Sequence, residues 1–178
     1  MKSLIGAVLA LVLVFAFAGT AMAAPFEVDE AGEFFIFGDY SYYSGGPSSD
    51  FTLGLGYALT DKLAVGVQYM TDIFNTWPYA FGAFAVLDLH PIVIRGEYMY
   101  FPLAPFSYGN ASVLYTFDVK ALTFGLGVGA SFYPWDTDFY IEAMASVDLG
   151  KDFSLYGTVY YVPSQTEHGF VAGVSLAF

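Results

Sequence analysis

Large hydrophobic residues alternate with small or polar residues along most of this chain. In residues 51–59, the odd positions read Phe, Leu, Leu, Tyr, Leu and the even positions read Thr, Gly, Gly, Ala. Residues 63–70, 122–132 and 139–148 repeat the scheme, again with one bulky and one smaller or more polar face. Successive side chains of a β-strand point to opposite faces, so a period of two predicts strands with two unlike faces. No stretch shows a helical period.

Turn-forming residues divide this pattern into ten segments of about ten residues. The predicted strands cover residues 33–43, 51–60, 63–72, 79–88, 92–101, 107–117, 121–133, 139–149, 153–162 and 169–178. Tight turns alternate with slightly longer loops that carry proline and aromatic residues, and this alternation is typical of an up-and-down barrel. We therefore predict an all-β fold: a closed antiparallel up-and-down transmembrane β-barrel, with ten strands preferred and eight as the alternative.

The composition indicates which face of such a barrel points outward. Hydrophobic residues make up 57% of the chain and charged residues only 12%, whereas a soluble domain has about 25% charged residues. The face of small residues has almost no lysine, so it is a poor water-exposed surface. We expect the bulky face to contact lipid and the small face to line the lumen. On this assignment Gly127→Lys is tolerated better than Leu126→Lys, because a lipid-facing lysine costs about 2–4 kcal/mol.

The N-terminal segment has the three parts of a secretory signal peptide. A charged start at Lys2 precedes an apolar run over residues 4–18, and residues 21–23 read Ala-Met-Ala, a small-x-small cleavage pattern. We expect residues 1–23 to be removed, residues 24–32 to form a short periplasmic lead-in, and residues 33–178 to form the barrel. The formal net charge is -12; loss of Lys2 makes it -12 - 1 = -13, which disfavours nucleic-acid binding.

Polar and charged side chains also occur on the predicted inward face. We expect a lumen cluster made of Arg95, Glu97, Asn110, Ser112, Glu142 and Gln68, with Asp39 and Asp148 on the same face. If the strands on either side of residues 102–106 pair, Glu97 lies opposite Asn110 and Arg95 opposite Ser112. Two interpretations stay open: an internal network that plugs a narrow barrel, because a buried lone arginine must be paired, or a constriction that selects solutes by charge.

Catalytic chemistry has little support in the sequence. There is no cysteine, which removes disulfides, thiolate catalysis and cysteine-ligated zinc, and we expect neither a metal nor a cofactor. His90 lies in a tight turn, while His168 lies in a longer loop that Asp136 and Asp138 could approach. A histidine–acid pair without a nucleophile is weak evidence for an enzyme. We expect no enzymatic activity; a rim active site near His168 and a surface adhesin stay as alternatives.

The last ten residues, 169–178, read GFVAGVSLAF and resemble the terminal strand of bacterial outer-membrane proteins. Gly173, Leu176 and the final Phe178 match that pattern, whereas Val171 stands where a polar residue is usual. The resemblance implies periplasmic chaperones and the barrel-assembly machinery as partners, surrounding outer-membrane lipid, and a Gram-negative-type envelope with periplasmic termini. Residues 155–163 also resemble the YfaZ family of small outer-membrane proteins. The function we expect is a structural or small-solute passage role in the outer membrane.

Overall fold

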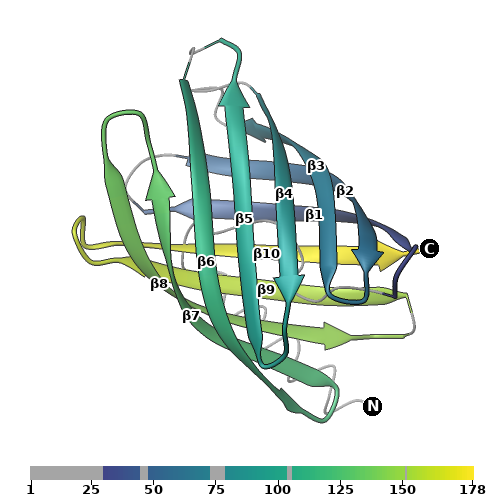
Figure 1. Ribbon diagram of the computed structural model, residues 1–178. Helices are drawn as coiled ribbons and strands as arrows, with labels where there is room; N and C mark the ends of the chain where they lie inside the picture. The colour runs from purple at the N-terminus through teal and green to yellow at the C-terminus, as the bar shows by residue number, and fades with distance from the viewer. Residues whose placement is uncertain (1–29, 45–47, 73–78, 104–105, 151) are drawn as a thin grey trace.

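The computed structural model describes residues 30–44, 48–72, 79–103, 106–150 and 152–178. Within these ranges the chain forms a closed, antiparallel, up-and-down barrel of ten strands (Figure 1). The strands are β1 (Phe34–Tyr43), β2 (Ser48–Thr60), β3 (Leu63–Asp72), β4 (Ala80–Asp88), β5 (Ile92–Phe101), β6 (Phe106–Val119), β7 (Leu122–Phe132), β8 (Thr137–Asp148), β9 (Phe153–Val162) and β10 (Glu167–Ala177). The preferred ten-strand prediction is confirmed and the eight-stranded alternative is wrong. No helix in the described ranges is long and apolar enough to span a bilayer.

The barrel closes between its first and last strands. β1 pairs with both β2 and β10, and the β1–β10 register runs from Phe35 opposite Ala177 to Tyr43 opposite Gly169. The backbone groups of Phe34 and Phe178 exchange two hydrogen bonds of 3.1 and 2.8 Å just beyond that ladder. The start of β1 and the end of β10 therefore lie at the same end of the barrel, together with the tight turns; we call this the short-turn end and the opposite one the long-loop end.

Strand boundaries agree with the sequence prediction to within three residues. The largest difference is β2, which begins at Ser48 instead of residue 51, while β8 and β10 each begin two residues early, at Thr137 and Glu167. All three extensions lie at the long-loop end. Their residues are all polar, so they carry no alternation of hydrophobic and polar positions for a sequence pattern to detect.

The outward face is apolar, as the strand patterns predicted. Leu53, Leu126 and Val128 are 52, 59 and 61% exposed, whereas Thr52 and Ala58, on the other face of β2, are buried. Exposed aliphatic and aromatic side chains of this kind occur all around the barrel, on strands from β1 to β10. The surface between the two rims therefore has the character of a lipid-contacting band.

The interior differs from the sequence expectation, because large side chains also point inward. Each of seven inward glycines lies directly opposite a large inward side chain on a neighbouring strand. The pairs are Phe37–Gly54, Phe35–Gly56, Phe84–Gly66, Met99–Gly82, Leu114–Gly127, Tyr140–Gly129 and Tyr156–Gly173. A Cβ atom at Gly54 would lie 2.1 Å from two ring carbons of Phe37. These glycines therefore accommodate their neighbours' side chains instead of opening the lumen.

This packing adds a cost to Gly127→Lys that the expected ranking of Gly127→Lys over Leu126→Lys did not include. A Cβ atom at Gly127 would lie 2.3 Å from the carbonyl oxygen of Val113 and 2.9 Å from Cγ of Leu114. Even alanine would require the backbone of β6 to move. The sequence shows which face a glycine is on, but not what its neighbour places over it.

One cluster of inward apolar side chains fills the short-turn half of the lumen. Phe84 packs against both Phe35 and Phe37, with ring centroids 6.1 and 5.4 Å away. We call this layer the apolar floor; it consists of Phe35, Phe37, Phe84, Val86, Val93, Leu114 and Met144, all at most 4% exposed. It is a packed hydrophobic core in the place where an open pore has water.

Candidate functional site

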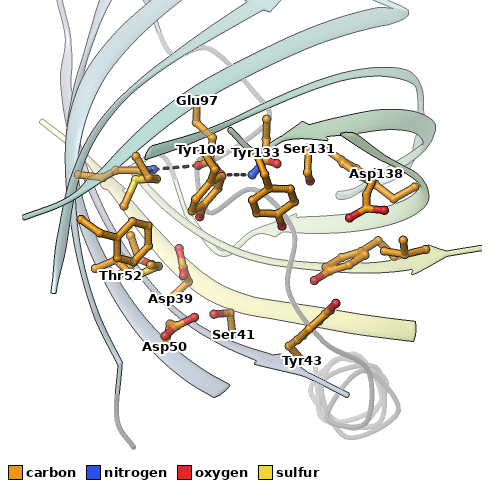
Figure 2. Close-up of a pocket in the computed structure, with 18 of the residues that line it drawn as sticks. Asp39, Ser41, Tyr43, Asp50, Thr52, Glu97, Tyr108, Ser131, Tyr133 and Asp138 are labelled. Carbon is orange, nitrogen blue, oxygen red and sulfur yellow. Dashed lines mark hydrogen bonds between the residues drawn. The ribbon is translucent and has the colours of Figure 1, made fainter. Parts of the chain in front are cut away.

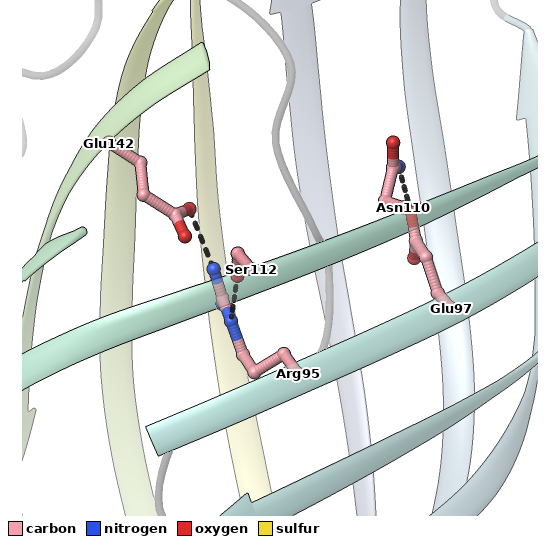
Figure 3. A network of polar contacts seen from close by, with 5 residues as sticks. All are labelled: Arg95, Glu97, Asn110, Ser112 and Glu142. Atoms are coloured by element: carbon pink, nitrogen blue, oxygen red, sulfur yellow. Dashed lines mark hydrogen bonds and ion pairs between the residues drawn. The ribbon is translucent and has the colours of Figure 1, made fainter. Parts of the chain in front are cut away.

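A buried ion pair lies inside the lumen on the long-loop side of the apolar floor. Arg95 projects inward from β5 and Glu142 from β8, with β6 and β7 between them. Nη2 of Arg95 lies 2.7 Å from Oε2 of Glu142, and both side chains are fully buried. Nε of Arg95 also donates to Oγ of Ser112, 3.4 Å away (Figure 3). Because the arginine and glutamate neutralise each other, the charges can be buried together.

A second polar group surrounds Glu97, two residues further along β5. Nε2 of Gln68 donates to one carboxylate oxygen at 2.8 Å, and Nδ2 of Asn110 donates to the other at 2.5 Å (Figure 3 shows the Asn110 contact). The strand register places Glu97 opposite Asn110 and Arg95 opposite Ser112, as the expected pairing required. The six residues of the expected lumen cluster thus face inward in two adjacent groups, one of them an ion pair and the other a carboxylate held by two amides.

Asp39, which was expected on the inward face, is 2% exposed on β1, and its Oδ2 accepts a hydrogen bond of 3.1 Å from the hydroxyl of Tyr156. Three inward tyrosines were not predicted: Tyr156, and also Tyr140 and Tyr160, which pack with ring centroids 5.7 Å apart. The opposing glycines, Gly173 and Gly129, are the sequence signal for two of these tyrosines, but the signal can be used only once the strand register is known. Asp148, also expected to face inward, is exposed at the end of β8.

Above these two groups, the long-loop end of the lumen contains a cavity of ≈ 280 Å³, which we call the vestibule. Asp39, Gln68, Glu97 and Asn110 contribute to its lining, whereas Arg95 and Glu142 do not. Figure 2 shows Asp39 and Asp50 on the wall formed by β1 and β2, with Glu97, Tyr108 and Tyr133 on other parts of the lining. The vestibule therefore lies on the long-loop side of the ion pair and of the apolar floor.

The lining of the vestibule is acidic and aromatic. Four carboxylates contribute to it, from Asp39, Asp50, Glu97 and Asp138, and none of the described lining residues is Lys, Arg or His. Aromatic rings surround its upper part: Phe101 stacks on Phe106 at 4.6 Å, and the rings of Tyr108 and Tyr133 lie 5.8 Å apart. A cavity with this lining favours positive charge and apolar surface.

The long-loop rim does not form the histidine–acid arrangement considered from the sequence. Oδ1 and Oδ2 of Asp138 accept hydrogen bonds from Ser164 and Gln165, at 3.1 and 2.6 Å. Nδ1 of His168 instead lies 3.4 Å from Oγ of Ser44, and that same Oγ accepts a hydrogen bond from the His168 backbone amide. With Asp138 bound to other residues, this rim gives no specific support to a histidine-based active site.

The three residues of the C-terminal pattern occupy different environments. Phe178 is 66% exposed and stacks on Phe34 at 6.3 Å, and Leu176 is 43% exposed on the outward face. Gly173 faces inward, where an added Cβ would lie 2.5 Å from the Tyr156 ring and 2.6 Å from Cβ of Asp39. Gly173 therefore has a packing role in the lumen, whatever its role in assembly.

The described part of the chain has no group of three or more His, Cys, Asp or Glu placed to hold a metal ion. The polar residues of the lumen are instead arranged as hydrogen-bonding groups, and their neighbours are side chains of the barrel wall. Such groups can bind or exclude a solute by charge, shape and hydrogen bonding.

Comparison with known proteins identifies a fold and no closer relationship. No protein-family model matches the sequence, and no curated protein matches it. Among solved structures, the KdgM porin matches with a TM-score of 0.53 at 12% identity, over 81% of this chain and 99% of that one. An outer membrane channel from Pseudomonas putida F1 matches with a TM-score of 0.52 at 9% identity, over 89% and 100%. The chain has the fold of outer-membrane porin-like barrels. KdgM in complex with disordered oligogalacturonate gives a TM-score of 0.52 at 12% identity, over 81% and 99%.

Proposed function

We propose that this protein is an integral outer-membrane barrel whose lumen is closed at rest and that it passes small solutes only when its closing layers move. The closure rests on one observation above the others: the Arg95–Glu142 pair joins β5 and β8 inside the lumen at 2.7 Å, with both side chains fully buried. A water-filled channel at that level would leave those charges exposed to solvent. The apolar floor adds a second barrier on the short-turn side of the pair.

The membrane location is supported by the surface and by the fold. Large apolar side chains, among them Val67, Val128 and Phe139 at 60, 61 and 69% exposure, would face water in a soluble barrel. A closed barrel satisfies its backbone hydrogen bonds internally, which is the requirement for a structure that crosses hydrocarbon. The similarity to outer-membrane porin and channel folds agrees with this location. The predicted export signal, residues 1–23, lies outside the described residues.

The orientation and biogenesis belong to the same proposal. We place the short-turn end, with the termini, in the periplasm and the long-loop end outside, so that the vestibule opens away from the cell. The C-terminal strand, with Gly173, Leu176 and Phe178, would be recognised by the barrel-assembly machinery after passage with periplasmic chaperones. Lipid of the outer membrane would then surround the outward face.

Passage of a solute would require both closing layers to open. The polar layer can open by side-chain movement at Arg95 and Glu142, but the apolar floor contains rings that pack against each other and against glycines. The cost of opening is therefore greatest at the floor. This predicts rare, brief openings in place of steady conduction, and it makes the resting protein a compact structural barrel of the envelope.

Conductance in a planar bilayer tests the closure directly. We expect the wild-type protein to be silent or to open only briefly. Replacing Phe37, Phe84, Arg95 and Glu142 together by alanine removes inward side chains from both layers and should produce stable conductance steps. The matched control is Phe34→Ala with Phe81→Ala, which truncates outward-facing rings of β1 and β4 and should leave the bilayer silent.

Two results would overturn the proposed closure. Steady conductance of the wild-type barrel would show that these layers do not close the lumen. Continued silence of the four-fold variant, once its folding has been verified by its shift on a gel run with and without boiling, would show that the barrier lies elsewhere.

A further inference from the structure

Four buried oxygen atoms of residues that line the vestibule have no hydrogen-bond partner among the described residues. They are the hydroxyl oxygen of Tyr140 and three carboxylate or amide oxygens: Oδ1 of Asp39, Oε1 of Gln68 and Oδ1 of Asn110. A hydroxyl can also donate, whereas the three carboxylate and amide oxygens can only accept. Asp39 and Gln68 are only 2 and 5% exposed, so these oxygens lie at the base of the vestibule and away from its rim. Buried acceptors without donors are uncommon in folded proteins and need an explanation.

The orientation of the two amides follows from the chemistry of Glu97. An ionised carboxylate can only accept hydrogen bonds, so both amides must turn their NH2 groups toward it. Gln68 and Asn110 do so, at 2.8 and 2.5 Å. Their carbonyl oxygens are thereby directed away from Glu97. Rotating either amide would bring two oxygens together, so Glu97 fixes both acceptors in place.

Asp39 is fixed in a similar way from the opposite wall. Its Oδ2 accepts the Tyr156 hydroxyl at 3.1 Å, and its Cβ lies close to Gly173, where a side chain would collide with it. The remaining oxygen, Oδ1, has no partner within hydrogen-bonding distance among the described residues, and Asp39 lines the cavity. A bound group that donates N–H bonds would supply the partners that Asp39, Gln68 and Asn110 lack.

The charge of the lining selects among such donors. Four carboxylates contribute to the vestibule and none of its described lining residues is a cation. The one arginine of the chain is held by Glu142 beneath the vestibule and does not line it. An anionic solute would therefore meet uncompensated repulsion, and a neutral one would gain nothing from the charge. Only a cationic donor uses both the empty acceptors and the negative lining.

The aromatic rings of the vestibule predict a second feature of its ligand, an apolar group. Phe101 and Phe106 are stacked at 4.6 Å, and Tyr108 lies 5.8 Å from the Phe101 ring, on the same wall of the vestibule. Rings of this kind bind apolar groups, and the faces of the rings bind cations. The cavity volume of ≈ 280 Å³ lies near the lower limit for small-molecule sites, which excludes a peptide or an oligosaccharide from full burial.

We propose that the vestibule is a binding site for a small protonated primary amine that carries an apolar or aromatic group. The ammonium group donates to Asp39, Gln68 and Asn110 at the base, and the apolar part lies against the rings above. This inference deepens the proposed function and rests on it, because a vestibule with a closed floor retains a ligand that an open pore would pass. It names the class of solute that the barrel would admit.

The experiment titrates the folded, full-length mature protein in a nonionic detergent with three small probes by isothermal calorimetry, with detergent blanks subtracted. Benzylammonium carries charge, ring and N–H donors. Benzyltrimethylammonium keeps the charge and the ring but has no N–H group, and benzyl alcohol keeps the ring without the charge. We expect one saturable site for benzylammonium per barrel and at least about tenfold weaker binding of the other two, since a charge-assisted hydrogen bond contributes about that factor.

Matched variants locate the site. Asp39→Asn removes one charge and keeps the size of the side chain, and it should weaken benzylammonium by about tenfold. Asp152→Asn removes the same charge from an exposed position beyond the short-turn end and should change nothing. The gel shift on boiling verifies that each variant is folded.

The outcomes separate this inference from the closure of the lumen. Absence of saturable benzylammonium binding, or equal binding of the three probes, would overturn the amine site while conductance still reports on the floor. Equal affinities of the Asp39→Asn and Asp152→Asn proteins would show that binding lies outside the vestibule and would also overturn it. Steady wild-type conductance combined with selective benzylammonium binding would remove the closed floor but keep the amine site.

Discussion

Gly54→Ala should destabilise the barrel even though it adds a single methyl group to a strand. The new Cβ would lie 2.1 Å from two carbons of the Phe37 ring, far inside van der Waals contact. The ring has little freedom to move, because it is 2% exposed and packs edge-on against Phe84 at 5.4 Å. Overpacking of this kind costs about 1–3 kcal/mol. We expect the free energy of unfolding to fall by that amount.

The partner substitution gives a thermodynamic cycle that isolates the contact. Phe37→Ala alone should cost about 3–5 kcal/mol, because it leaves a cavity in the apolar floor. In the Phe37→Ala background the clash is gone, so adding Gly54→Ala should cost close to nothing. The predicted coupling between the two sites is therefore about 1–3 kcal/mol, in the sense that the double variant is more stable than the sum of the single effects.

Urea titration of the protein folded into lipid vesicles, followed by the gel shift on boiling, measures these free energies. The control is Gly96→Ala, an outward glycine whose added Cβ would meet no atom closer than the Asn110 carbonyl oxygen at 3.9 Å. That variant should be as stable as the wild type or slightly more stable. If Gly54→Ala and Gly96→Ala have equal effects, the glycines do not accommodate inward rings and the description of the floor is wrong.

The same titration tests three other parts of the account. Arg95→Met alone should lower the free energy of unfolding by about 3–5 kcal/mol, because it leaves Glu142 buried and unpaired. Combining Arg95→Met with Glu142→Leu should regain most of that loss. Equal losses in the single and the double variant would contradict the ion-pair argument. Gly173→Ala should lower the free energy of unfolding of protein that is folded without any assembly machinery. Phe178→Ala, at a 66% exposed position, should lower that free energy by less than about 1 kcal/mol and should instead lower the yield of folded barrel in cells. The reverse ranking would make Gly173 an assembly signal alone. Leu126→Lys should cost about 2–4 kcal/mol in vesicles, and an unchanged urea midpoint would show that this face does not meet lipid.

Strand positions and barrel closure could be predicted from sequence because lipid imposes one simple rule. Along residues 51–59 every second side chain must be apolar, and turn residues mark where the rule ends. The rule stops at the rim, so the first residues of β2, β8 and β10, such as Ser48 and Thr137, were missed. The six polar lumen residues were found for a related reason: an arginine or a glutamate cannot point into hydrocarbon, so Arg95 and Glu142 had to face inward.

The filling of the lumen could not be predicted in the same way. Phe35 and Phe37 stand on the opposite face of β1 from Phe34 and Ile36, so that strand is apolar on both faces and shows no alternation. Their inward position depends on Gly56 and Gly54 of the next strand, and hence on the register between two segments of the chain. The vestibule likewise depends on which side chains from β1, β3, β5 and β6 meet, which no single strand reveals.

Labelling of single cysteines from one side of the membrane tests the closed lumen most directly, because the natural chain has no cysteine. Ser131→Cys lies in the vestibule lining, and Ser146→Cys faces inward near the short-turn end. With the barrel inserted in one direction into vesicles, a charged thiol reagent added at the long-loop side should modify Ser131→Cys quickly and leave Ser146→Cys unmodified. Rapid modification of both cysteines from that side would mean that the lumen is open from end to end.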